Sequence, residues 1–279
     1  MTPKEYLDRY TYLKFSDPLT RNKLEGGISN YGSGWDSRNG NAGAGKKMQM
    51  EYQFFAQALR AAHHGNAHTP CGKKFFFDQK PLGDIASTED FYTESFINSF
   101  NGKGSPDEIT DTLRLAVAIG RVGTNQDAAG QQPARPTAQA YATDFITLDC
   151  NGLVGNYYGG DPSASIEHYA NAGRSRKSAA TIQVGDAVVT HCEAYKFEHV
   201  GLIQECSFMG STAKIRLVEW GWFGGEDVHY SKEPKSYEIK QGPDKRFGFG
   251  WETNSNHNKS VKSFRYVFGP PPNIESRGW

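Results

Sequence analysis

The chain has 279 residues, enough for one large domain or for a catalytic domain with an extension. Its 31 Lys and Arg residues balance 31 Asp and Glu residues, so the zero formal charge gives no support for electrostatic binding to nucleic acid or an anionic membrane. No stretch reaches the ~18–20 apolar residues that span a bilayer, and the N-terminal sequence lacks the apolar core of a secretory signal. We therefore expect no membrane span, and synthesis in the cytoplasm without a signal peptide.

Residues 1–105 are expected to form an N-terminal extension that is partly helical and wraps the rest of the protein. Residues 48–64 carry aromatic and aliphatic side chains at helical spacing, whereas residues 26–45 are rich in Gly, Asn and Ser and indicate a loop. A cluster of possible metal ligands follows, formed by His63, His64, His68 and Cys71. Its spacing matches no metal-ligand pattern, so we expect no metal and no other cofactor.

Residues 106–279 are expected to form the second domain. Its first helix begins at a strong signal, Ser105-Pro106-Asp107-Glu108, and continues to Gly120. Helices are also predicted at 150–158 and 163–172. From residue 186 onward the hydrophobic period changes from helical to alternating, which predicts strands at 186–190, 199–204, 213–219, 236–239 and 263–268. Helices followed by antiparallel strands are typical of the α+β class.

Cys150 and His199 are the main candidates for chemistry. Cys150 stands at the start of a predicted helix and His199 at the start of a predicted strand. A helix N-terminus and a neighbouring imidazolium both stabilise a thiolate, the reactive form of cysteine. Taken singly, the two residues would be interpreted as a buried thiol and a structural histidine. Together with the motifs around them they favour a nucleophile and its base, with a third polar group to orient the imidazole.

Three short runs occur in a characteristic order: Asp-Cys-Asn-Gly-Leu-Val at 149–154, Val-Gly-Asp-Ala-Val-Val at 184–189 and His-Val-Gly-Leu-Ile at 199–203. This order resembles the papain-like cell-wall hydrolases, both the NlpC-type cysteine peptidases and the CHAP amidases, over residues 109–222. The chain departs from the pattern at Asn151, where serine is usual, and it lacks the Tyr-x-Trp-Gly-Gly stretch before the cysteine. The resemblance implies an α+β, papain-like fold with N-terminal helices packed on a central antiparallel sheet.

The resemblance also suggests roles for further residues. Glu219 is similar to the CHAP glutamate that accepts a hydrogen bond from the imidazole, with His191 and Glu198 as alternatives. Strand alternation places Glu198 on the opposite face from His199. Tyr141 is similar to the family tyrosine that supports the oxyanion site, although core packing is an alternative. The remaining candidates for substrate or oxyanion contacts are Asn151, Trp220 and Trp222.

The implied activity is that of a peptidoglycan stem-peptide amidase or endopeptidase that works through a thioester. Such an enzyme would act as an antibacterial effector, for example of type VI secretion, or as a lytic enzyme in the periplasm or cell wall of a target cell. Its expected partners are the peptidoglycan peptide, a cognate immunity protein and a secretion-system component. Two alternatives stay open: a deamidase, protease or acyltransferase toxin that acts on a host protein, and a non-catalytic interaction protein with a degenerate papain-like domain.

Overall fold

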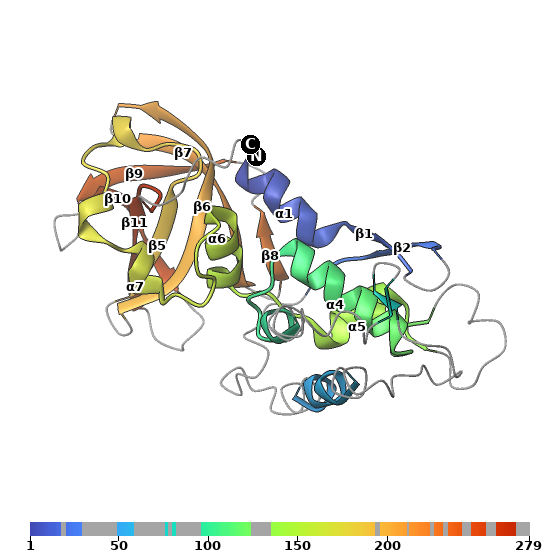
Figure 1. Cartoon of the computed structure of the whole chain (residues 1–279). Helices are drawn as coiled ribbons and strands as arrows, with labels where there is room; N and C mark the ends of the chain where they lie inside the picture. Colours follow the sequence, from blue (N-terminus) through green and yellow to red (C-terminus); the bar gives the residue numbers. More distant parts are fainter. Residues whose placement is uncertain are drawn as a thin grey trace. The chain divides into compact units, whose positions relative to one another are not determined.

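The computed structural model (Figure 1) describes residues 1–17, 21–29, 49–58, 76–77, 80–81, 96–123, 135–192, 196–210, 212–223, 226–230, 234–241, 247–254 and 261–271. The chain divides into two compact units, one made of residues 1–8 with 149–279 and the other of residues 9–148. The helix that begins at Pro106 groups with the residues before it, and the boundary expected between residues 105 and 106 stays a prediction. Most of the glycine-rich loop and the whole His63–Cys71 cluster lie outside the described residues.

The unit of residues 9–148 combines helices with short strands. Its named elements are β1 (Leu13–Ser16), β2 (Lys23–Gly26), β3 (Phe76–Phe77), β4 (Lys80–Pro81), α4 (Pro106–Ala118) and α5 (Ala138–Phe145), with further helical residues at 49–58 and 96–100. β1 pairs with β2, and β3 with β4, in two small antiparallel ribbons.

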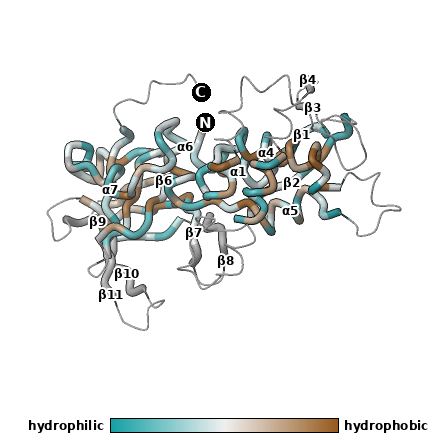
Figure 2. Tube along the Cα trace, turned by 60° about the horizontal axis from the view of Figure 1, so that its bottom comes forward, coloured by the Kyte–Doolittle hydropathy of each residue, from teal (hydrophilic) through white to brown (hydrophobic). Residues whose placement is uncertain are grey.

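The expected start of α4 is confirmed. The Ser105 hydroxyl accepts from the Glu108 amide, and the Glu108 carboxylate accepts from the Ser105 amide, which forms a capping box. The buried residues of α4 include Ile109, Leu113 and Val117. Hydrophobic residues are brown in the tube of Figure 2.

The other unit contains the sheet. It includes the first residues of α1 (Pro3–Thr11), followed by α6 (Cys150–Tyr158), α7 (Ile166–Tyr169) and two 3-10 turns (Ala172–Arg174 and Ala179–Thr181). Its strands are β5 (Ala187–Cys192), β6 (Lys196–Met209), β7 (Thr212–Phe223), β8 (Glu226–Tyr230), β9 (Lys235–Gln241), β10 (Phe247–Asn254) and β11 (Val261–Phe268). The strand order β6–β5–β11–β10–β9–β7 returns to its beginning because β7 also pairs with β6. The result is a closed, six-stranded antiparallel barrel, and β8 pairs with the end of β7.

The expected papain-like fold, with helices packed on a central antiparallel sheet, is therefore wrong. The hydrophobic alternation located five of the six barrel strands, but alternation reports only that a strand has one buried face. Closure depends on β6, which is 14 residues long and pairs with β5 on one side and β7 on the other. Register shifts interrupt both pairings, and bulges of this kind bend and twist strands as closure requires.

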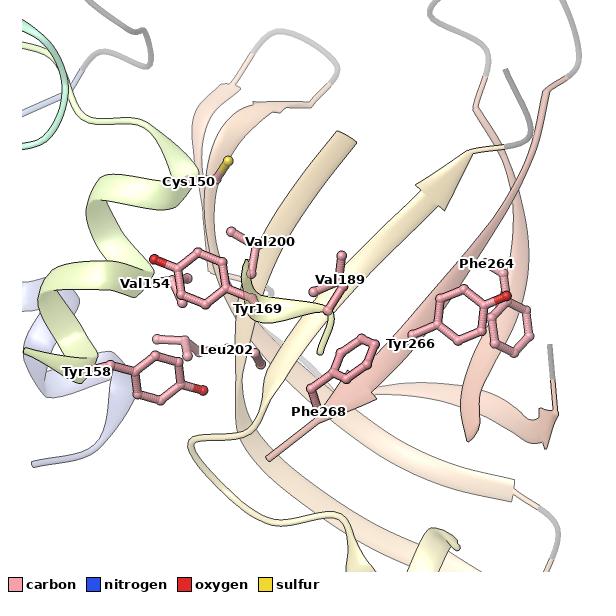
Figure 3. Close-up of a cluster of buried hydrophobic side chains, with 12 residues drawn as sticks. Cys150, Val154, Tyr158, Tyr169, Val189, Val200, Leu202, Phe264, Tyr266 and Phe268 are labelled. Carbon is pink, nitrogen blue, oxygen red and sulfur yellow. The ribbon is translucent and has the colours of Figure 1, made fainter. Parts of the chain in front are cut away.

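Two hydrophobic clusters show which way the strands face. One cluster receives side chains from all six barrel strands, so it fills the barrel interior; its members include Val188, Ile203, Leu217, Ile239, Phe249 and Val267. The other cluster contains residues of only three strands, β5, β6 and β11, together with α6 and α7. Figure 3 shows this second cluster, in which Val154 and Tyr158 of α6 face Val200 and Leu202 of β6. The helix therefore packs on the outer face of the barrel wall.

Candidate active site

Cys150 is the first residue of α6, as the sequence predicts. Asp149 is the N-cap, and its Oδ1 accepts a hydrogen bond from the amide of Gly152 at 2.6 Å. The helix ends at Gly159, whose φ of 65° provides the left-handed C-cap. An α-helix leaves its first amides without intrahelical partners. The amides of Cys150 and Asn151 belong to the same first turn of the helix, beside the thiol.

His199 lies next to a bulge in β6. Thr190 of β5 pairs with His199, but the next residue, His191, pairs with Phe197, so Glu198 is an extra residue in β6. Bulges re-aim side chains and are common beside active sites. The His199 side chain is buried, and its imidazole lies close enough to the thiol of Cys150 for the thiol to raise its pKa. The base and the nucleophile thus meet although 48 residues lie between them in the chain.

Glu219 completes a row of three side chains. Its Oε2 lies 3.0 Å from Nε2 of His199. Glu219 stands opposite Gly201 in the β6–β7 pairing, where a Cβ added to Gly201 would lie 2.6 Å from Cγ of Glu219. A glycine at position 201 therefore gives the Glu219 side chain its path to the imidazole.

The electrostatic environment stabilises a charged imidazole. Burial by itself lowers the pKa of His199, but hydrogen bonds to Cys150 and Glu219, and the negative charges on both, raise that pKa to about 10. The ring is therefore protonated at neutral pH and stands beside the thiol as an imidazolium. Burial also raises the pKa of Tyr169, and the charges of Cys150 and Asp149 raise it further, so the phenol near the nucleophile stays neutral.

The arrangement contains the parts needed for acyl transfer through a thioester. Cys150 supplies the nucleophile, His199 can hold and return its proton, and Glu219 fixes the orientation of the ring. The amides at the start of α6 are donors for an oxyanion.

His191, one of the alternatives for the third residue, lies elsewhere. The ring of His191 packs edge-on against Phe197 and Tyr266, with centroids 5.3 Å and 6.0 Å away. Its neighbour Thr190 pairs directly with His199, so alternation places His191 on the opposite face of the sheet. Glu219 is thus the carboxylate that the structure brings to His199.

Among the candidates for substrate or oxyanion contacts, Asn151 lies nearest to the nucleophile, with its Oδ1 4.0 Å from Sγ of Cys150. Trp220 is fully buried, so its side chain packs in the interior of the protein. Tyr141 belongs to the other unit, where its hydroxyl donates to Glu51 at 2.8 Å. The side chain of Trp222 lies outside the described residues, and its role stays a prediction.

One residue of the site was missed. Arg265 of β11 places its Nη1 3.1 Å from Oε1 of Glu219, the oxygen not directed at His199. A signal was present in the sequence, because alternation puts Arg265 on the same strand face as Val267, which lies in the barrel interior. A cation on an inward face requires a buried partner.

Comparisons of the chain with protein-family models, curated proteins and solved structures found no match. Across the described residues, no group of three or more His, Cys, Asp and Glu side chains is arranged to hold a metal ion. Within the same part of the chain, every helix is too short or too polar to cross a bilayer. The geometry of the site and the order of the sequence motifs therefore supply the argument for function.

Proposed function

We propose that the protein is a cysteine-dependent amide hydrolase that cleaves the stem peptides of peptidoglycan. The observation that carries the chemistry is the row Cys150–His199–Glu219, buried within one compact unit. A cysteine that serves only in packing needs no buried imidazole beside it that a carboxylate holds in place. A cysteine nucleophile does need such an imidazole as its base.

In the proposed reaction the thiolate of Cys150 attacks the amide carbonyl carbon and forms a carbon–sulfur bond. The amides of Cys150 and Asn151 donate to the developing oxyanion. The carbon–nitrogen bond then breaks, and the imidazolium of His199 gives its proton to the leaving amine. In the second half, neutral His199 takes a proton from water as the water oxygen attacks the thioester. The acid product leaves, and the thiolate and imidazolium are restored.

The choice of substrate is supported by the three sequence motifs and not by the fold. Residues of the first and third motifs lie at the site: Asp149 caps α6, and the run that begins at His199 contains the glycine over which Glu219 passes. Peptidoglycan lies outside the cytoplasm, so the proposal includes delivery to the periplasm or cell wall of a target cell by a secretion system or a phage. It also includes a cognate immunity protein that protects a producing bacterium.

Digestion of purified peptidoglycan tests this proposal. Wild type, Cys150→Ala and Cys206→Ala are compared, and the products are identified by mass spectrometry. Cys206 is a half-buried thiol whose Sγ lies 3.7 Å from the carbonyl of Ile182, and it belongs to no part of the site. We expect stem-peptide cleavage by wild type and Cys206→Ala, and none by Cys150→Ala.

The other outcomes separate the alternatives. Cleavage that survives Cys150→Ala refutes the proposed nucleophile. No cleavage by wild type, combined with rapid alkylation of Cys150 by iodoacetamide, refutes the substrate and favours a toxin that modifies a host protein. No cleavage and slow alkylation together refute an enzyme and favour the interaction protein.

A further inference from the structure

We infer that Arg265 is a positioning residue of the proposed site, which holds Glu219 ionised and directed at His199. The inference rests on the proposed function, because it assigns a role within the same row of side chains. Arg265 would touch neither the substrate nor the reacting atoms. Its effect would pass through the Glu219 carboxylate, one oxygen of which faces Arg265 while the other faces His199.

The ion pair spans the barrel. Two strands separate β7 from β11 in either direction around the ring, β6 and β5 on one side and β9 and β10 on the other. Glu219 and Arg265 therefore come from opposite walls. Arg265 pairs with Thr190, and Thr190 pairs with His199. The side chains of Arg265, Thr190 and His199 therefore share the inward face near one end of the barrel. The ion pair thus lets Arg265 of β11 hold Glu219 of β7 from the opposite wall of the barrel.

Burial makes this contact matter for chemistry. The side chains of Glu219 and Arg265 are only 7% and 11% exposed, so water contributes little to the solvation of either charge. A buried carboxylate that loses one of its two counter-charges takes up a proton or turns toward solvent more readily. Either change would weaken its hold on the imidazolium. Arg265 supplies the counter-charge on Oε1 and leaves Oε2 for Nε2 of His199.

The pH profile of Cys150 alkylation tests the role without any substrate. The rate of carboxamidomethylation by iodoacetamide is measured from about pH 4 to 10 by mass spectrometry, and its acid midpoint marks the appearance of the thiolate. The groups that face the row are Asp149 at the start of α6, Tyr169 of α7 and Arg265 itself. Wild type is compared with Arg265→Met and Arg265→Lys. The matched control is Arg216→Met, which removes a different ion pair of the barrel, the one between Arg216 and Glu205.

We expect the acid midpoint to rise by about one pH unit in Arg265→Met, because the site without the cation binds a proton more tightly. Arg265→Lys keeps the charge and stays near the wild-type midpoint, as does Arg216→Met. In a Glu219→Gln background, Arg265→Met should cause no further change, because the carboxylate through which Arg265 acts is absent. Circular dichroism confirms that each variant is folded, and Arg265→Gln replaces any Arg265→Met protein that is not.

Two results would overturn the inference. An unchanged midpoint in Arg265→Met, with a normal wild-type profile, removes the role of Arg265 and leaves the proposed function intact. A shift that persists in the Glu219→Gln background shows that Arg265 acts directly on the thiolate and not through Glu219. By contrast, wild-type Cys150 that reacts no faster than Cys206 refutes the proposed function itself.

Discussion

Replacement of Gly201 by alanine should impair catalysis by displacing Glu219. The added Cβ would lie 2.6 Å from Cγ of Glu219, whereas ordinary contacts begin at 3.4 Å, so the side chain must retreat by about 0.8 Å. If the retreat is along the line to His199, the 3.0 Å distance between Oε2 and Nε2 grows to about 3.8 Å, beyond hydrogen-bonding range. A displacement of this size lowers the rate by about 10²-fold, equivalent to about 2.7 kcal/mol.

The second-order rate of Cys150 alkylation and the turnover of peptidoglycan measure this effect. Gly210→Ala is the control: Gly210 has a φ of 65° and nothing within 4 Å of an added Cβ, so its substitution strains the backbone far from the site. We expect Gly210→Ala to lower the melting temperature while activity is retained, and Gly201→Ala to lower activity in a folded protein. A Gly201→Ala protein with wild-type rates would refute the steric role given to this glycine.

Two further predictions concern the charge on His199 and the cap of α6. The pKa of His199 is raised from 6.5 to about 10 by folding, so its stabilising contribution is complete below about pH 6.5 and is lost as pH rises through about 10. Thermal unfolding from pH 6 to 11 should show this loss in wild type and not in His199→Gln, and equal profiles would contradict it. Asp149→Ala removes the acceptor of the Gly152 amide and should cost about 1 kcal/mol in urea unfolding, while Asp149→Ser should recover most of that loss.

Local signals in the sequence were sufficient for the elements that position the nucleophile. The helix predicted at 150–158 is found at Cys150–Tyr158, because a capping aspartate precedes it and a glycine follows it. The strand that bears His199 was also predicted, although it extends much further in both directions, over Lys196–Met209. Hydrophobic periodicity identifies such elements because it is a property of neighbouring residues.

Closure of the barrel depends on pairings that periodicity does not report. β10 was not predicted, because Gly248 and Gly250 interrupt its apolar residues and resemble a turn. Without β10, β9 and β11 each lack one of their two partners, and an open sheet is the natural expectation. Arg265 was missed for a related reason. Its partner Glu219 is recognisable only when β7 and β11 are known to face each other across a closed ring.

The contact between Arg265 and Glu219 across the barrel has a consequence for the charge balance of the proposed reaction. In the proposed mechanism the resting site holds two cations, Arg265 and His199, which balance two anions, Glu219 and the thiolate of Cys150. After acylation the sulfur is neutral and the imidazole has given its proton to the departing amine, so one cation and one anion remain. The buried row is neutral in both states, and no counter-ion has to enter or leave during turnover. The charge that the protein must newly solvate is then confined to the oxyanion, next to the first amides of α6.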